Sequence, residues 1–242
     1  MERVEVDVGD WQVVAVDGEL RVALTPAADG GPGGVCCCPA DSGRGVTSVC
    51  DQVEAIVARA GQVISNPVSG ERVEYRQTSA ATGGELLQWV HVLEPGRRVP
   101  ADHVHWAQEE RFEILSGTAT VRLGKRTLIL KPGDDLLIPA GTAHGLRNEG
   151  TVQLRVLTEL RPAMRTEEYF ETVFGLAHDG KVDKRGLPNL LRGSVIVRDL
   201  GEKSGVAGVP IGLTNVLSAL FALVGRRLGY RAVYPKYTDI NS

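Results

Sequence analysis

Hydrophobic and polar residues alternate with a period of two over most of residues 62–160, the pattern of β-strands with one buried face. Glycine-bearing turn pairs such as Ser69-Gly70 and Pro132-Gly133 separate the alternating segments. Many short strands punctuated in this way predict a β-sandwich or barrel. The segments resemble no crossover helix, so a parallel sheet is not expected. The predicted strands are 62–66, 71–79, 85–93, 109–116, 118–123, 126–131, 134–139, 143–148 and 152–160.

The chain before this region divides into three segments. Residues 2–24 alternate on both sides of Asp17-Gly18, which predicts a short β-hairpin extension. Residues 25–46 are dense in glycine and proline and are predicted to form a disordered linker. The linker contains Cys36, Cys37 and Cys38 without C-x-x-C spacing, so we interpret these thiols as incidental, with a redox or metal role as the alternative. Residues 47–60 have helical spacing and are predicted to enter the folded domain as a helix.

After Pro162 the hydrophobic spacing becomes helical. Helices are predicted over residues 166–177 and 190–200, joined by a polar loop. In the first of these helices, the apolar residues lie on one face, which consists of Tyr169 or Phe170 with Val173, Phe174 and Ala177.

Residues 207–225 contain no charged side chain and are followed at once by Arg226 and Arg227. About 20 apolar residues are needed to cross a bilayer, so membrane contact through residues 207–227 is one interpretation. Thr214 and Asn215 interrupt the apolar run, however. We therefore favour an amphipathic or buried helix that packs on the barrel.

Charge excludes one class of function and divides the chain unevenly. The net charge of −3 does not suit electrostatic binding of nucleic acid. Residues 181–242 hold 10 Lys and Arg against 4 Asp and Glu, a net of +6, whereas the preceding residues carry −9. The chain starts without a charged-then-apolar leader, so a reducing, cytoplasmic location is expected, with membrane association as the alternative.

Three of the five histidines lie between Gly96 and Asn148. His103 and His105 are two residues apart in an extended segment, so their imidazoles point to the same side. Glu110 begins the next strand, and His144 follows the turn at Pro139-Ala-Gly141. Three imidazoles and one carboxylate suit Fe(II), Mn(II), Zn(II), Ni(II) or Cu(II), and they leave open positions on an octahedral metal. We predict that these four residues bind one divalent transition metal.

The same residues resemble the two motifs of the cupin superfamily. The first motif matches His103, His105, Glu110 and Gly117, with a leading gap one residue longer than usual. The second matches Gly133, Pro139, Gly141, His144 and Asn148 without a gap. The resemblance covers about residues 62–160. It implies a cupin-type jelly-roll β-barrel with the metal inside, and many cupins pair as homodimers.

The expected fold class is therefore mainly β, with extensions at both ends. The N-terminal extension is expected to be partly disordered, and the C-terminal extension helical. The predicted parts are a hairpin extension (1–24), a linker (25–46), the barrel (47–161) and the helical extension (162–242).

Several further residues are candidates for roles near the site. Glu109 would replace Glu110 if the strand register shifted by one. We interpret His91 as facing outward or filling the core, because no partner is visible, with an acid or base in the cavity as the alternative. His178 is expected to be exposed in a polar loop. Arg111, Arg122 and Arg147 are assigned to the solvent face, with an anionic substrate as the alternative, and the predicted cavity-facing residues are Trp89, Phe112, Ile114 and Leu137.

Three functions remain open from the sequence, because the cupin fold does not fix the reaction. The first is a metal-dependent enzyme acting on a small organic molecule, with dioxygenase-like chemistry, and the apolar cavity residues favour a hydrophobic or aromatic substrate. The second is an isomerase or epimerase, which a cavity base such as His91 would favour. The third is a non-enzymatic binding or regulatory protein, held at a membrane by its C-terminal helix.

Overall fold

The computed structural model describes residues 12–16, 19–23, 58–201 and 204–237. The chain divides into two units, Met1–Glu54 and Ala55–Ser242, which are described separately. In the first unit, strands β1 (Gln12–Val16) and β2 (Glu19–Ala23) pair antiparallel. This pairing confirms the predicted hairpin within residues 12–23. The predicted strand before residue 12, the linker at 25–46 and most of the helix at 47–60 lie outside the described residues. Residues 58–60, the end of that predicted helix, are not helical.

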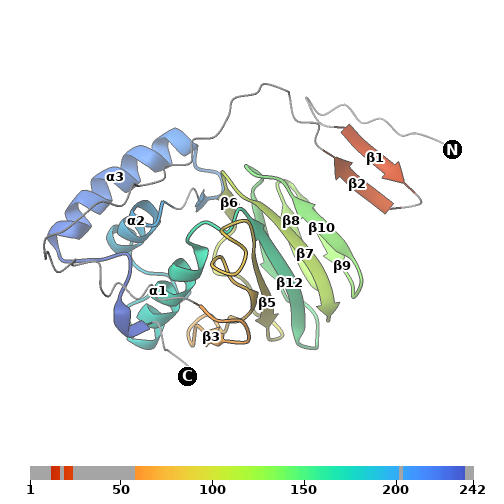
Figure 1. Ribbon diagram of the computed structural model, residues 1–242, viewed down its shortest axis with the longest axis horizontal. Helices are drawn as coiled ribbons and strands as arrows, with labels where there is room; N and C mark the ends of the chain where they lie inside the picture. The colour runs from red at the N-terminus through yellow and green to blue at the C-terminus, as the bar shows by residue number, and fades with distance from the viewer. Residues whose placement is uncertain (1–11, 17–18, 24–57, 202–203, 238–242) are drawn as a thin grey trace, which may run out of the picture. The chain divides into compact units, whose positions relative to one another are not determined.

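The second unit contains two antiparallel sheets (Figure 1). The six-stranded sheet has the order β10-β7-β12-β5-β4-β3, and the five-stranded sheet has the order β13-β6-β11-β8-β9. The period-two pattern located the strands well, and the two sheets confirm the predicted jelly-roll arrangement. The bounds are β3 Val63–Ser65, β4 Arg72–Gln77, β5 Leu87–Leu93, β6 His103–His105, β7 Glu109–Ser116, β8 Ala119–Leu123, β9 Arg126–Leu130, β10 Asp135–Ile138, β11 His144–Arg147, β12 Leu154–Arg161 and β13 Ser204–Val206.

Strand β13 was missed in the sequence. It is three residues long, contains glycine and belongs to the helical extension, so it carries no alternating pattern. It pairs antiparallel with β6, and its Ser204 and Val206 lie opposite His105 and His103. The C-terminal extension therefore covers the edge of the strand that carries two of the predicted ligands.

Two apolar clusters hold this unit together. One consists of strand residues of both sheets and includes Phe112, Ile114 and Leu146. The other consists of residues from β3, β4 and β5 together with helical residues, and includes Trp89 and Phe174. The six-stranded sheet therefore extends beyond the five-stranded sheet at its β3–β5 end, and helices cover that part.

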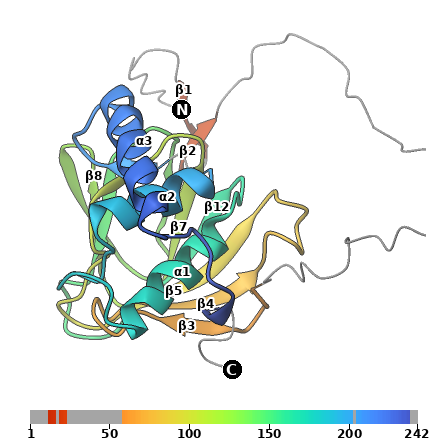
Figure 2. The same ribbon diagram turned by 90° about the vertical axis from the view of Figure 1, so that its left-hand side faces the viewer.

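Those helices are α1 (Thr166–His178), α2 (Leu190–Asp199) and α3 (Ile211–Arg227), with a 3₁₀ turn, η1, at Pro235–Tyr237. Figures 1 and 2 show α1 beside the β3–β5 part of the sheet, with α2 and then α3 farther out. The predicted face of α1 is confirmed, since Val173, Phe174 and Ala177 are buried. The side chain of Asn189 accepts a hydrogen bond from the Arg192 N–H and so caps the start of α2.

Helix α3 packs mainly on α2 and meets the barrel only near its start, where Thr214 lies beside Gly205 of β13, so the predicted packing on the barrel is wrong for most of the helix. Ala222 and Gly225 are its buried residues, and a Cβ at Gly225 would lie 2.8 Å from the Leu191 carbonyl oxygen. Small residues thus permit the close approach of the two helices. The opposite face carries exposed leucines and valines, among them Leu220 at 57% exposure. In the described part of the chain, no helix is both long enough and apolar enough to cross a membrane.

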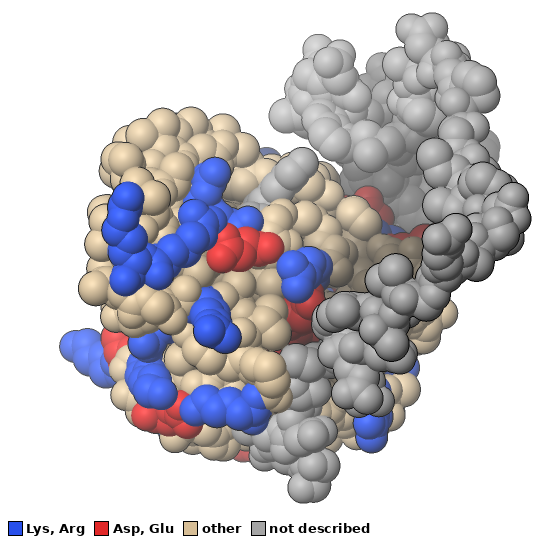
Figure 3. All heavy atoms as spheres, turned by 60° about the vertical axis from the view of Figure 1, so that its left-hand side comes forward, with Lys and Arg blue, Asp and Glu red and all other residues tan. Residues whose placement is uncertain are grey.

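Basic side chains gather on the helical side of the molecule (Figure 3). Arg198, Arg226 and Arg227 are exposed there, and Arg226 forms an ion pair with Asp199. The positive charge predicted for the C-terminal residues is therefore a surface feature of α2 and α3.

Candidate metal site and cavity

Strand β6 positions the first two predicted ligands. His103 and His105 are separated by the buried Val104, so both rings point to one side of the strand. Their Nε2 atoms are 3.1 Å apart. The Gly141 N–H donates to the His105 carbonyl oxygen over 2.7 Å, and Gly141 has a φ of 81°, a conformation that favours glycine. The second motif's turn is thus tied directly to the strand of the first.

Glu110 and His144 complete the cluster from the two sheets. Glu110 lies on β7 of the six-stranded sheet, and His144 begins β11, opposite His103 on β6. His144 Nε2 is 2.6 Å from Glu110 Oε2, and His105 Nε2 is 3.8 Å from the same oxygen. One ligand atom from each of the four residues lies within 4.8 Å of all the others. The carboxylate in the cluster belongs to Glu110, so the register alternative with Glu109 is not needed.

Backbone carbonyls orient two of the rings. His103 Nδ1–H donates to the Ala101 carbonyl oxygen over 3.1 Å, and His144 Nδ1–H donates to the Thr142 carbonyl oxygen over 2.9 Å. Each of these bonds fixes the proton on Nδ1 and leaves Nε2 with its lone pair directed at the cluster. This is the tautomer that a metal ligand requires.

Burial and mutual charge keep three of the four cluster residues, His103, His105 and Glu110, in their ligand form. Burial, assisted by His105 and His144, lowers the pKa of His103 to about 3. Burial also lowers the pKa of His105, although Glu110 opposes the shift. Burial would raise the pKa of Glu110, but the neighbouring histidines, His144 first, outweigh it and lower that pKa to about 2. The pKa of His144 is raised, because Glu110 outweighs the effect of burial. Glu110 is therefore a carboxylate at neutral pH, and His103 and His105 are neutral.

The cluster fits a divalent metal on the geometry of its own atoms. Glu110 Oε2 and His144 Nε2 are buried, and their close contact is not aligned as a hydrogen bond. Lone pairs of several ligands facing one point repel each other unless a cation lies between them. Three imidazoles and a carboxylate can hold a transition metal and leave coordination positions open.

Gln108 is a supporting residue that sequence reasoning missed. It is 1% exposed, and its amide NH₂ donates to the carbonyl oxygens of Pro162 and Ala163 and to the Thr166 hydroxyl. Burial lowers the pKa of His105, and the neighbouring Gln108 side chain opposes that shift. Gln108 therefore links a cluster ring to the start of α1. The sequence contained one signal for this role, because Gln108 is a polar residue between the two histidines of the first motif and Glu110.

Three of the four cluster residues, His103, His105 and Glu110, line a cavity of about 250 Å³, slightly below the range of about 300–1,000 Å³ common for ligand pockets. Trp89 and Phe112 line it as predicted, whereas Ile114 and Leu137 do not. Ile114 is buried between the two sheets. Leu137 lies opposite Arg111 on the outer strand pair.

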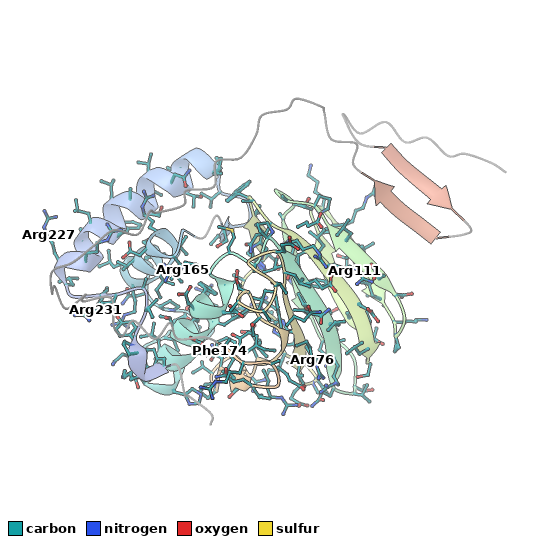
Figure 4. All side chains as sticks on the ribbon, viewed as in Figure 1. Arg76, Arg111, Arg165, Phe174, Arg227 and Arg231 are labelled. Atoms are coloured by element: carbon teal, nitrogen blue, oxygen red, sulfur yellow. The ribbon has the colours of Figure 1, made fainter. Side chains whose placement is uncertain are left out.

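About half of the apolar wall comes from the C-terminal extension. Helix α1 supplies Tyr169, Phe170, Val173 and Phe174, α2 supplies Val197, and β13 adds Val206. Figure 4 labels Phe174 on α1. The rings of Trp89 and Phe170 meet edge to face, with centroids 5.4 Å apart. The helical extension therefore shapes the space in which a ligand would lie.

His91 lines this cavity, which corrects the interpretation that it faces outward or fills the core without a partner. It is 5% exposed, and its Nε2 is 3.2 Å from Oε1 of Glu71, which also lines the cavity. Glu71 was missed, although the period-two pattern places it on the same face as the buried Val73 and Tyr75. The sequence signal for Glu71 was a carboxylate on a strand face that is otherwise apolar.

The remaining candidates lie away from the cavity. Arg111 forms an ion pair with Asp135, and Arg122 and Arg147 both approach Asp102, so all three belong to the solvent face as predicted. His178 is exposed, as predicted, but it ends α1 instead of lying in the loop, and its ring donates to the Ser65 carbonyl oxygen.

Two antiparallel sheets with three histidines and a glutamate gathered between them define a class of protein: a double-sheet β-barrel whose interior can hold a metal. Residues 89–158 match the cupin domain family. The chain belongs to the cupin superfamily through this barrel, as its two motifs predicted.

Individual relatives are similar to this region and not to the whole chain. Protein SchB of Streptomyces halstedii is 35% identical over 85 residues, which are 35% of this chain and 59% of that protein. The protein named polyketide synthase CurC, of Streptomyces cyaneus, is 31% identical over 85 residues, which are 35% of this chain and 53% of that protein. The chain thus spans little more than half the length of these two relatives. A solved structure from Thermus thermophilus is 32% identical and covers 33% of this chain and 74% of its own, with a TM-score of 0.32.

Proposed function

We propose that this protein is a metal-dependent enzyme that acts on a small organic molecule with an apolar or aromatic body. The observation that carries the proposal is the cavity itself, in which His103, His105 and Glu110 of the metal cluster face an aromatic wall. A pocket of this kind binds the body of a ligand through apolar contact and directs its polar group toward the cluster.

The chain's own residues contribute binding, orientation and exclusion of water. Trp89 and Phe170 provide ring faces and edges against which a planar ligand can pack. The Nε1–H of Trp89 is buried without a hydrogen-bond partner, so it can donate to a ligand oxygen. When bound, a divalent metal supplies Lewis acidity at the polar group and, if it is redox-active iron, a centre for dioxygen chemistry.

Dioxygenase-like chemistry is the first reaction class that we propose. Its support is the nitrogen-rich ligand set, whose open positions suit Fe(II) with a substrate and dioxygen together. The test is dioxygen uptake by the iron-loaded protein with candidate phenols or thiols. Uptake coupled to consumption of one of these compounds is expected, and no turnover with any metal or substrate would contradict the proposal.

An isomerase or epimerase is the second candidate, because His91 lies in the cavity. A metal that polarises a carbonyl and a base that moves a proton are the requirements of such a reaction. A carbonyl-bearing substrate also agrees with the name of the Streptomyces cyaneus relative, since polyketides carry repeated carbonyl groups. The dioxygen experiment separates the two classes, because an isomerase consumes none.

Metal content tests the part common to both classes. We expect about one transition-metal ion per chain in gently purified protein, and its loss in His103→Ala and His144→Ala. His178→Ala is the matched control, because His178 is exposed at the end of α1 and its removal should leave the metal in place. Wild-type protein that binds no transition metal would refute a metal-dependent function.

A further inference from the structure

Outside the metal cluster, the cavity contains a second pair of ionisable side chains, His91 and Glu71. Their side chains are 7% and 4% exposed, and His91 Nε2 is 3.2 Å from Glu71 Oε1. Both come from the six-stranded sheet, His91 from the middle of β5 and Glu71 from the residue before β4. Side chains of this kind are seldom so completely buried unless they are paired or used.

The carboxylate of Glu71 is held in place on its other side. Its Oε2 accepts a hydrogen bond from the Ser69 hydroxyl over 2.8 Å, and the Glu71 N–H donates to the same hydroxyl oxygen over 3.3 Å. One carboxylate oxygen is thus fixed by Ser69, and the other faces His91. This arrangement places a fixed carboxylate beside an imidazole, as in a hydrolytic triad, although without an aligned hydrogen bond between them.

His91 retains hydrogen-bonding capacity for a ligand. The contact of Nε2 with Glu71 is too poorly aligned to count as a hydrogen bond, so this buried nitrogen is unsatisfied. No hydrogen bond to a described residue involves its Nδ1. If Nε2 carries the proton toward Glu71, Nδ1 is the nitrogen with a free lone pair. The positive charge that His91 would gain on accepting a proton is compensated by the carboxylate beside it.

We infer that His91, positioned by Glu71, is a general base that removes a proton from a ligand bound between the metal cluster and Trp89. The inference rests on the proposed function and adds the ligand's chemistry: a compound with an acidic C–H next to a carbonyl group. The C–H bond breaks, its electron pair stays on the ligand as an enolate, and an N–H bond forms at His91 Nδ1. Return of the proton to the same carbon regenerates the base and the carbonyl compound.

The test measures hydrogen–deuterium exchange of a probe ketone, 2-hydroxyacetophenone, whose phenyl ring suits the aromatic wall. Zinc-loaded protein in D₂O is expected to accelerate exchange at the carbon beside the carbonyl, followed by proton NMR. His91→Ala should lose about 10²- to 10⁴-fold of that acceleration while keeping its zinc. Added imidazole should restore part of it, a rescue that a merely structural role would not produce.

Glu71 is tested as a positioning residue with two variants. Glu71→Gln keeps the size of the side chain but removes the charge, so exchange should fall while zinc content and probe binding stay the same. Glu71→Asp keeps the carboxylate and should recover part of the rate. If His91→Ala fails to fold, the two Glu71 variants still test the inference. His178→Ala is the control, and its exchange rate should match that of wild type.

The outcomes separate this inference from the proposed function. Full exchange in His91→Ala with normal zinc content would overturn the role of His91 and leave a metal-dependent enzyme in place. Failure of the wild-type protein to accelerate exchange over buffer would overturn it as well. A wild-type protein that holds no metal would instead overturn the proposed function.

Discussion

The metal cluster and the cavity wall that faces it come from different parts of the chain. The cluster lies wholly between residues 103 and 144, within the region that matches the cupin family. About half of the apolar wall comes from α1, α2, β13 and the loop between the two helices, which lie C-terminal to that region. The difference teaches that the barrel provides the residues that can bind a metal, while the added helices supply about half of the apolar surface that a ligand there would contact.

The two apolar clusters show the same division. The cluster between the sheets contains one aromatic residue, Phe112, among aliphatic ones. The cluster under the helices contains Tyr75, Trp89, Phe174 and Tyr237 and has Tyr169, Phe170 and Tyr234 packed against it. The cavity lies where the two clusters meet, since Phe112 and Leu146 line it from one and Trp89 and Phe174 from the other. A ligand there would contact the cluster between the sheets on one side and the cluster under the helices on the other.

Removing a large side chain from the helical wall should have the largest effect on stability and little effect on the metal. Phe174 is 2% exposed, contacts the ring of Phe170 and lines the cavity. Phe174→Ala is expected to lower the free energy of unfolding by about 3–5 kcal/mol, measured by urea denaturation, with metal content per folded chain unchanged. Leu190→Ala is the control, because Leu190 is 74% exposed. Loss of metal from folded Phe174→Ala protein would contradict the division between cluster and wall.

Gln108 lies beside both the metal cluster and the helical wall. Replacing it should therefore have a moderate effect on metal affinity and on the contacts at the start of α1. Its amide group donates hydrogen bonds to Ala163 and to Thr166 at the start of α1, and its side chain lies beside His105. Gln108→Leu removes these hydrogen bonds at similar size, and we expect metal affinity to fall about 10- to 100-fold, as for other residues that orient a ligand. A competition titration with a chelator measures the change. Gln77→Leu, on the exposed part of β4, is the control, and equal affinities in the two variants would show that His105 needs no such support.

The division also explains what the sequence could predict. Strands β7 to β12 were predicted to within two residues, because alternation and glycine turns are local signals. The four cluster residues were found because their spacing is fixed by two adjacent motifs. Glu71 and Phe174, by contrast, lie far apart in the chain and reach one cavity only through sheet pairing and helix packing, so no local pattern connects them. His91 was misjudged because its partner lies on a neighbouring strand, in contact only after folding.

Helix α3 marks the outer limit of the helical wall, and the smallest effect is expected there. Leu220 is 57% exposed, so it contributes little to the folded unit, and Leu220→Gln should change the free energy of unfolding by no more than about 0.5 kcal/mol. Gly225 on the same helix faces α2, where an added Cβ would lie 2.8 Å from backbone and side-chain atoms. Gly225→Ala should therefore lower the free energy of unfolding by about 1–3 kcal/mol through overpacking. Urea denaturation of both variants at low protein concentration measures the contrast. A large loss in Leu220→Gln would mean that the apolar face of α3 is covered in the native protein, and the helix would then belong to a buried layer instead of the surface.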